Sequence, residues 1–413
     1  MTHDSVGVSN VSSTVAARIC VLVCGLITGI ASARALGPVG RGQYFAVTTL
    51  SAMIAQTVNF GLTSSNVFLG ARDSRRLWPL LMNSVYLACG LVLISAATVA
   101  LGGVRLGAVI GVPSEMIWAV CLIGPAMLLW NLAASLLVAE QRFHALNLWQ
   151  AANAVITLAA IVACARWGTG PSAFVFAVAI CATGMAIGLC AFIARNKHGS
   201  MRFSWELVHI GVGFSIRAYL ALLFGYLLQR AGASMLAAHG RPDALGQYSI
   251  ASQMFDVLVI IPGSVSTVLY PLLVQRPEDS WPHVRRTALY TTLTMLGACV
   301  GTSLVCPWII PFVFGARFAA SVPVLWALLP AVLSYSVVSV LSQYLAARAF
   351  PTSLILIWAA GLLAAVCIGV PLTRVYGGIG AAMGQSFGAV LVCVAVAILV
   401  WRRLAGGERR AYA

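Results

Sequence analysis

The sequence contains very little charge for its length. Of its 413 residues only 8% are charged and 61% are hydrophobic, whereas a soluble globular protein has about 25% charged and about 45–50% apolar residues. So few polar side chains cannot cover a water-soluble particle of this size. The composition excludes a soluble enzyme, a DNA-binding domain and a secreted disulfide scaffold, and it predicts a chain that uses lipid as part of its solvent.

Acidic residues, lysine and metal-binding patterns are also scarce. Ten acidic residues oppose 25 basic ones, which gives a net charge of +15, and Lys197 is the one lysine. Most arginines lie between apolar runs, where they are expected to set membrane orientation and not to bind nucleic acid. The eleven cysteines form no CxxC pair and the histidines are scattered singly. We therefore predict no metal site, no cofactor and no nucleic-acid partner.

Long apolar runs fill most of the chain. A membrane-spanning helix needs about 20 predominantly apolar residues, and twelve runs meet that requirement: 12–33, 43–69, 78–102, 115–138, 146–167, 171–194, 207–229, 245–274, 287–310, 320–345, 352–373 and 377–401. The longest connection, Arg195 to Glu206, separates six runs from six. We predict an all-α integral membrane protein with about 12 transmembrane helices in two pseudo-symmetric six-helix bundles, an N-terminal lobe of residues 1–200 and a C-terminal lobe of residues 201–413.

The two halves resemble each other in sequence. A shift of 204 residues superimposes Pro38, Gly42, Gln43, Tyr44, Thr63 and Arg72 on Pro242, Gly246, Gln247, Tyr248, Thr267 and Arg276. The shared Gly-Gln-Tyr triplet opens the second and the eighth run. Because six spans is an even number, both halves would insert the same way up, as in transporters built from parallel repeats.

Basic residues are distributed unequally between alternate connections. With the N-terminus inside, fifteen lie in cytoplasmic segments and seven, including Arg41, lie in outer segments. This bias predicts that both termini lie in the cytoplasm.

Three arginines fall inside or at the edge of the runs, namely Arg18, Arg217 and Arg230. A charged side chain in hydrocarbon costs about 2.5–3.5 kcal/mol on insertion scales, and it usually faces a cavity or a partner. Snorkelling to the surface is the alternative for Arg18, a buried structural pair for Arg217, and interfacial anchoring at the outer end of its span for Arg230. We treat all three as candidates for binding substrate.

Asp256 is the acidic residue that lies well inside a run. It could neutralise Arg217 or Arg230, or accept a coupling proton. Polar side chains also recur at helical spacing, either to hold helices together or to line a hydrated cavity. These stripes are Thr49, Gln56, Asn59, Thr63 and Asn66 in the second run, Ser249, Ser252, Gln253, Asp256, Gly263, Thr267 and Tyr270 in the eighth, and Ser336, Ser339, Ser342 and Gln343 in the tenth. Three stripes beside buried arginines favour the cavity, with Gln56, Asn59, Gln253 and Asp256 in its wall.

The sign of the charge inside the spans indicates the ligand. At most three guanidinium groups face one carboxylate, and guanidinium groups bind phosphate bidentately. An anion, in particular a phosphate or diphosphate, is the expected substrate group. A cation exporter would need carboxylates there, and the first run contains none.

Two segments resemble a known family. ALGPVGRGQY at residues 35–44 and LGQYSIA at residues 245–251 are similar to the corresponding stretches of bacterial polysaccharide flippases of the Wzx type. Twelve spans in two halves are also similar to that family over nearly the whole chain. One relative, the lipid II flippase, typically has two further helices, for which this chain has no room.

The resemblance implies a transporter of the bacterial cytoplasmic (inner) membrane. It would move an undecaprenyl-diphosphate-linked oligosaccharide from the cytoplasmic to the periplasmic leaflet by alternating access, for surface polysaccharide biosynthesis. Carried over by helix position, Arg18 and Arg217 would face the diphosphate. The implied partners are this lipid-linked glycan, membrane lipids and polysaccharide assembly machinery.

Two other functions compete with this one. A drug or metabolite antiporter of the same superfamily would share the architecture, and the lack of an acid in the first run counts against it. A polysaccharide polymerase or glycosyltransferase would need a long outer loop or paired carboxylates, and the sequence has neither. We therefore predict that the protein is not an enzyme.

Overall fold

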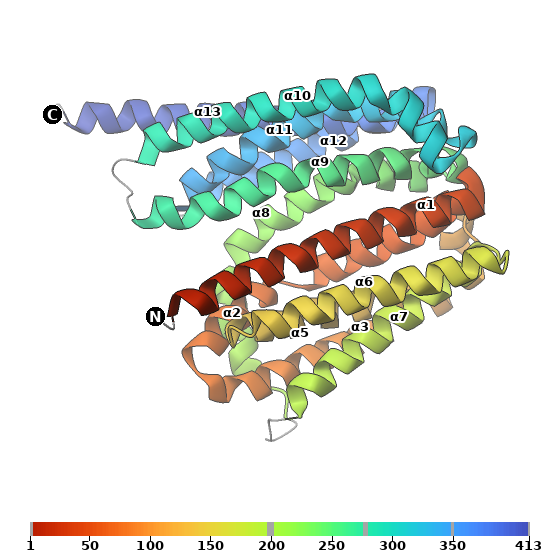
Figure 1. The fold of residues 1–413 in the computed structure, drawn as a ribbon, viewed down its shortest axis with the longest axis horizontal. Coiled ribbons are helices and arrows are strands. Elements are labelled where there is room, and N and C mark those ends of the chain that lie inside the picture. Colours follow the sequence, from red (N-terminus) through yellow and green to blue (C-terminus); the bar gives the residue numbers. More distant parts are fainter. Residues whose placement is uncertain (1–2, 196–201, 276–279, 348–350, 412–413) are drawn as a thin grey trace. The chain divides into compact units, whose positions relative to one another are not determined.

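The structure, a computed structural model, describes residues 3–195, 202–275, 280–347 and 351–411, so Lys197, Arg276 and Arg348 lie outside it, as does the side chain of Tyr270. The described residues form helices joined by short turns (Figure 1). The helices are α1 (His3–Val58), α2 (Leu62–Arg72), η1 (Ser74–Arg76), α3 (Leu77–Ile110), α4 (Ser114–Ile117), α5 (Val120–Ala139), α6 (Phe143–Arg166), α7 (Pro171–Ala194), α8 (Trp205–Ala238), α9 (Pro242–Gln275), α10 (Ser280–Phe314), η2 (Ala316–Phe318), α11 (Ser321–Ala347), α12 (Thr352–Tyr376) and α13 (Gly378–Ala411).

Eleven helical segments of the described chain are long and apolar enough to cross a membrane. The first of them, Thr14–Val58, contains both the first predicted span and most of the second. With that segment counted as two, the twelve runs found in the sequence all appear as helices. The prediction of an all-α multi-pass membrane protein is confirmed.

A kink at Gly37 divides α1 into two limbs. Gly37 has φ 63° and ψ −176°, a conformation that is essentially restricted to glycine, and Pro38 then starts the second limb with the φ value that a first helical position needs. Arg41 fastens the kink, because its Nη1 donates to Ser32 Oγ at 2.5 Å and its guanidinium lies 5.2 Å from the Tyr44 ring centre. We counted Arg41 as an outer-segment residue, and the structure buries it inside the kinked helix.

The predicted second span, residues 43–69, is not one continuous helix. It breaks after Val58, where Phe60 and Gly61 have φ values of 46° and 76°. Asn59 stabilises the break, because its Oδ1 accepts from Thr63 Oγ1 at 2.9 Å and its carbonyl oxygen accepts from Leu62 N at 2.8 Å. The polar stripe predicted for this span therefore changes direction between α1 and α2.

The sequence repeat corresponds to a structural repeat. Gln43 Nε2 donates to Gly111 O at 3.2 Å, and in the second half Gln247 Nε2 donates to Arg317 O at 2.7 Å. Gly111 and Gly315, which are 204 residues apart, both follow the third long helix of their half with positive φ values. In each half, the Gln of the Gly-Gln-Tyr triplet thus bonds to the turn that follows the next long helix, which is what two pseudo-symmetric halves predict.

The chain separates into two compact units, one of residues 1–219 with 240–243 and one of residues 220–239 with 244–413. The border passes through α8, whereas we predicted it between residues 200 and 201. Residues 196–201 of the predicted connection lie outside the described residues. The boundary between moving lobes stays a prediction.

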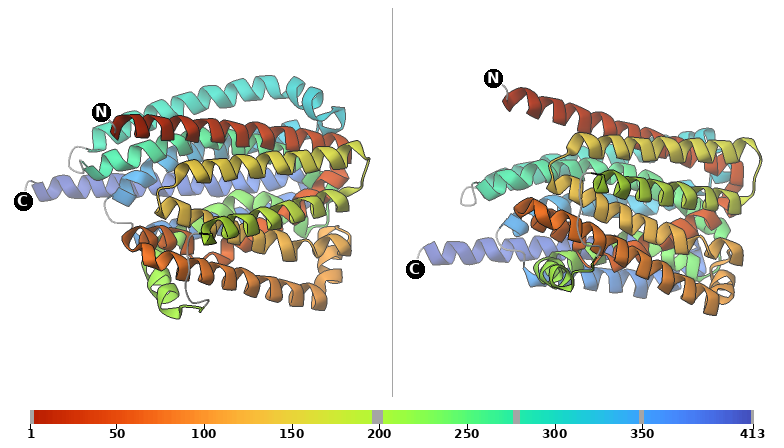
Figure 2. Two further views of the ribbon diagram at one scale, coloured as in Figure 1. Left: turned by 60° about the horizontal axis from the view of Figure 1, so that its bottom comes forward. Right: turned by 90° about the horizontal axis from the view of Figure 1, so that it is seen from below.

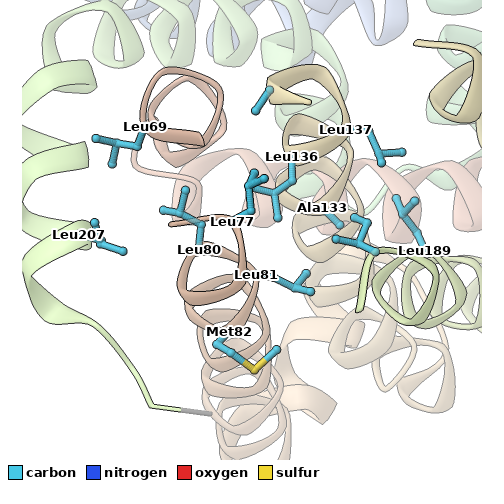
Figure 3. Packing of buried hydrophobic residues seen from close by; sticks show 12 residues of the cluster. Leu69, Leu77, Leu80, Leu81, Met82, Ala133, Leu136, Leu137, Leu189 and Leu207 are labelled. Carbon is cyan, nitrogen blue, oxygen red and sulfur yellow. The ribbon is translucent and has the colours of Figure 1, made fainter. Parts of the chain in front are cut away.

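Leucines at helical spacing build the core of the first unit. Leu77 and Leu81 of α3 lie on the side of Leu136 of α5 and Leu189 of α7, and Leu80 of α3 is turned towards Leu69 of α2 (Figure 3). The spacing of three and four residues places the α3 leucines on one side of the helix, where they bury apolar area against their neighbours.

Small residues build the tightest contact of the second unit, between α12 and α13. Gly361, Gly369, Gly384 and Gly388 approach so closely that a methyl group at Gly384 would overlap the Gly369 backbone. Glycines four residues apart allow such close backbone packing in membranes. Beyond this contact, α13 runs past the ends of α11 and α12 towards the C-terminus (Figure 2).

Candidate functional site

An ion pair joins α8 and α9 inside the second unit. Arg230 Nη2 lies 3.0 Å from Asp256 Oδ2, and Arg230 Nη1 donates to Ser252 Oγ at 3.1 Å. Ser252 and Asp256 lie one turn apart on α9, and Tyr226 lies one turn before Arg230 on α8 with its ring centre 5.8 Å from the guanidinium. The i, i+4 spacing on both helices aims these four side chains at one another.

The structure corrects the place we gave Arg230. We predicted it at the outer end of a span that closes at residue 229, but α8 continues to Ala238. Arg230 therefore lies about 12 Å inside the helix at 1.5 Å per residue, where it pairs with Asp256 and does not serve as a terminal anchor. Of the two partners we considered for Asp256, Arg230 is the observed one. Gln253 lies half-buried one turn before Asp256 on α9.

A second polar network lies near this pair in the same unit. Tyr248 donates its hydroxyl to Gln385 Oε1 at 2.5 Å, and Gly232 N donates to the same oxygen at 3.4 Å. This network links α8, α9 and α13. Tyr226, Gln385 and the bond from Arg230 to Ser252 were not predicted from the sequence, although the repeated Gly-Gln-Tyr triplet marked Tyr248.

Arg18 and Arg217 both lie in the first unit. Both side chains are exposed, and the ion pairs found in the described part of the chain include neither of them. Arg217 lies about 18 Å from the start of α8 at 1.5 Å per residue. An arginine at this depth without a carboxylate partner can bind an anion without first breaking an ion pair.

Gln56 and Asn59 lie beside the helix that carries Arg217. Tyr219, two residues after Arg217, donates its hydroxyl to Gln56 O at 3.1 Å and to Thr57 O at 2.5 Å. One turn earlier on α8, the Phe214 ring stacks on Phe68 of α2 with centres 4.1 Å apart. The helix break at residues 59–61 is thus docked against the first half of α8, within one unit.

The predicted site residues therefore fall into two groups. The first unit holds Arg18, Arg217, Gln56 and Asn59, and the second holds Arg230, Gln253 and Asp256. The first group carries two positive charges without a carboxylate partner among the described residues, whereas the second group carries a guanidinium that a carboxylate already neutralises. Among the residues that the structure describes, no cluster of three or more His, Cys, Asp or Glu side chains could hold a metal ion.

Several solved structures share this fold. An inward closed structure of the lipid II flippase MurJ matches with a TM-score of 0.78 and 14% identity, covering 94% of this chain and 87% of that one. An inward-facing multidrug resistance MATE family transporter of the MOP superfamily matches with a TM-score of 0.72 and 12% identity, covering 94% and 96%. A mutant of a MATE transporter from Vibrio cholerae has a TM-score of 0.54 and 15% identity, covering 96% and 98%. A search of curated protein sequences gives no match.

A family model described as polysaccharide biosynthesis protein matches residues 32–323. That stretch includes the kink at Gly37, the break at residues 59–61 and the Arg230–Asp256 pair. The solved structures that share the fold are a flippase and transporters. With more than half of its length matched by that model, the chain belongs to the polysaccharide biosynthesis protein family.

Proposed function

We propose that the protein is a flippase for an undecaprenyl-diphosphate-linked oligosaccharide. It would move this lipid-linked glycan from the cytoplasmic to the periplasmic leaflet of the bacterial inner membrane for surface polysaccharide biosynthesis. Both termini would lie in the cytoplasm, as the distribution of basic residues predicts. The family match supports the polysaccharide part of this proposal, and the arginines of the spans support the diphosphate part.

The observation that carries the proposal is the pair of exposed arginines in the first unit. Arg18 and Arg217 have no carboxylate at ion-pair distance among the described residues, and Asp256 forms its ion pair with Arg230. An uncompensated guanidinium in a span is expensive, so its retention is best explained by an anionic ligand. Two guanidinium forks suit the oxygens of a diphosphate.

Gln56 and Asn59 would support the same site. Asn59 Oδ1 is occupied by Thr63, which leaves its amide group as the hydrogen-bond donor for substrate, and Gln56 offers both a donor and an acceptor. In the second unit, Arg230 would bind the substrate phosphate only after the phosphate has displaced the Asp256 carboxylate. Gln253 and the freed Asp256 would then bind other polar groups of the substrate.

Alternating access would move the substrate across. An N-terminal lobe of residues 1–200 would rock against a C-terminal lobe of residues 201–413, which are halves of parallel repeat type. The sugar headgroup would pass through the protein while the lipid tail stays in the bilayer. A cross-link that locks the outer loops should stop transport, and unchanged transport would contradict rocking.

The test is complementation of cells that lack the gene. We expect wild type to expose undecaprenyl-diphosphate-linked glycan on the periplasmic side, and Arg217→Ala to leave most of it inside. Arg105→Ala removes another exposed arginine, near the end of α3, and should behave as wild type. If glycan distribution never depends on the gene, the proposal is wrong, and export of drugs or metabolites becomes the function to measure.

A further inference from the structure

A cavity lies in the first unit, and neither Arg18 nor Arg217 lines it. It measures about 230 Å³ and is lined by Ala126, Met127, Trp130 and Asn131 of α5, Asn153 of α6 and Ala182 of α7. These residues lie about 12–20 Å along their helices from the ends at Ala139, Phe143 and Ala194, taking 1.5 Å per residue. The cavity is therefore at the depth of the hydrocarbon core.

The polar groups of this cavity have no hydrogen-bond partner within the described residues. The side chains of Trp130, Asn131 and Asn153 take part in none of the hydrogen bonds formed there. Other carboxamides of the same unit connect helices, because Asn66 Nδ2 donates to Leu132 O at 3.4 Å and Asn83 pairs twice with the Ser204 backbone. Asn131 is exposed and Asn153 is half-buried. A carboxamide without a partner is costly in hydrocarbon, so both side chains are available for a polar occupant.

The chemistry of the lining fits a sugar. A carboxamide offers two N–H donors and one carbonyl acceptor, which matches hydroxyl groups that both donate and accept. The indole of Trp130 supplies a flat apolar face together with an N–H donor. No charged side chain lines the cavity, so a neutral group suits it better than a phosphate. Its volume is below the about 300–1,000 Å³ of pockets for drug-sized ligands, which suits one sugar ring.

We infer that this cavity is a glycan subsite, in which Asn131, Asn153 and Trp130 hold one neutral sugar of the lipid-linked headgroup. The inference rests on the proposed function. It assigns recognition of the sugar to this cavity and leaves recognition of the diphosphate to the arginines. Arg18 and Arg217 would then set affinity for any lipid diphosphate, and the cavity would set preference for a glycosylated one.

The experiment compares binding of two lipids to the purified full-length protein by native mass spectrometry. One lipid is undecaprenyl diphosphate, and the other is the undecaprenyl-diphosphate-linked oligosaccharide extracted from cells that lack the gene. We expect wild type to bind the glycosylated lipid at least 10-fold more tightly. Asn131→Ala and Asn153→Ala should each reduce that preference about 5-fold, the value of one lost hydrogen bond, and leave binding of the plain lipid unchanged within 2-fold.

Three further variants separate recognition from folding. Asn83→Ala removes two hydrogen bonds to the Ser204 backbone, so it should lower thermal stability. Because Asn83 does not line the cavity, the preference for the glycosylated lipid should stay as in wild type. Trp130→Phe keeps an aromatic face and should lose less preference than Trp130→Ala.

Three results contradict the inference or the function beneath it, and they differ from one another. Cavity variants that keep the wild-type preference would overturn the subsite while the flippase stands. Cavity variants in which binding of both lipids weakens equally would also overturn the subsite, because the cavity would then not recognise the sugar. Failure of wild type to bind either lipid would contradict the proposed function itself.

Discussion

The ion pair between Arg230 and Asp256 predicts an unequal response to removing its two partners. Breaking a buried ion pair costs about 3–5 kcal/mol, but the Asp256 side chain is 42% exposed and Arg230 is 20% exposed, so we expect about 1–3 kcal/mol. A lone carboxyl group can become neutral by taking up a proton, whereas arginine stays charged. Asp256→Leu should therefore destabilise the protein more than Arg230→Leu.

Thermal unfolding of the detergent-solubilised protein measures this difference. For a unit of this size about 1 kcal/mol corresponds to a shift of about 2–4 °C in Tm, so Asp256→Leu should lower Tm by about 2–12 °C. The double variant Arg230→Leu/Asp256→Leu should melt above Asp256→Leu, because it leaves no uncompensated charge. Losses that simply add in the double variant, or a larger loss for Arg230→Leu, would refute the reasoning.

Three shorter predictions follow from other features. Gly37→Ala should lower the stability of the protein by about 1–3 kcal/mol, because the kink needs a backbone conformation that favours glycine. Gly25→Ala, on the same helix, adds a methyl group in open space and should raise the stability by about 0.5–1 kcal/mol. Thermal unfolding of both variants measures these changes. Gln385→Leu should cost about 1–3 kcal/mol, because it leaves the buried Tyr248 hydroxyl without its acceptor, and unfolding midpoints that equal wild type would contradict it. A reporter enzyme fused after Ala413 should be active only in its cytoplasmic form, and activity of a periplasmic reporter would reverse the predicted orientation.

Span number and type could be predicted from composition and length, because lipid-facing helices need long apolar runs. Helix interruptions were harder to predict. Gly37-Pro38 carries local signals of a break, but residues 43–69 are apolar enough to be predicted as one span in spite of their polar stripe. The break at Asn59–Gly61 packs against α8, where a side chain at Gly61 would overlap Ser215. Hydropathy contains no information about such contacts.

The charged residues of the candidate site could be predicted from the sequence, but which of them form an ion pair could not. A charged residue within an apolar run is visible in sequence, which identified Arg18, Arg217, Arg230 and Asp256. The choice of Arg230 as the partner of Asp256 depends on the full extent of α8, which continues nine residues beyond the end of the apolar run. The cavity of Asn131 and Asn153 combines three helices, and isolated asparagines give no periodic signal.

Reconstitution of the purified protein in proteoliposomes tests the central claim most directly. The quantity is the fraction of undecaprenyl-diphosphate-linked oligosaccharide that becomes accessible to an externally added glycan-modifying enzyme when the lipid starts on the inner leaflet. We expect transfer that requires the protein and falls at least 10-fold with Arg217→Ala, but not with Arg105→Ala. Transfer at the same rate in protein-free vesicles, or in vesicles with Arg217→Ala, would contradict it.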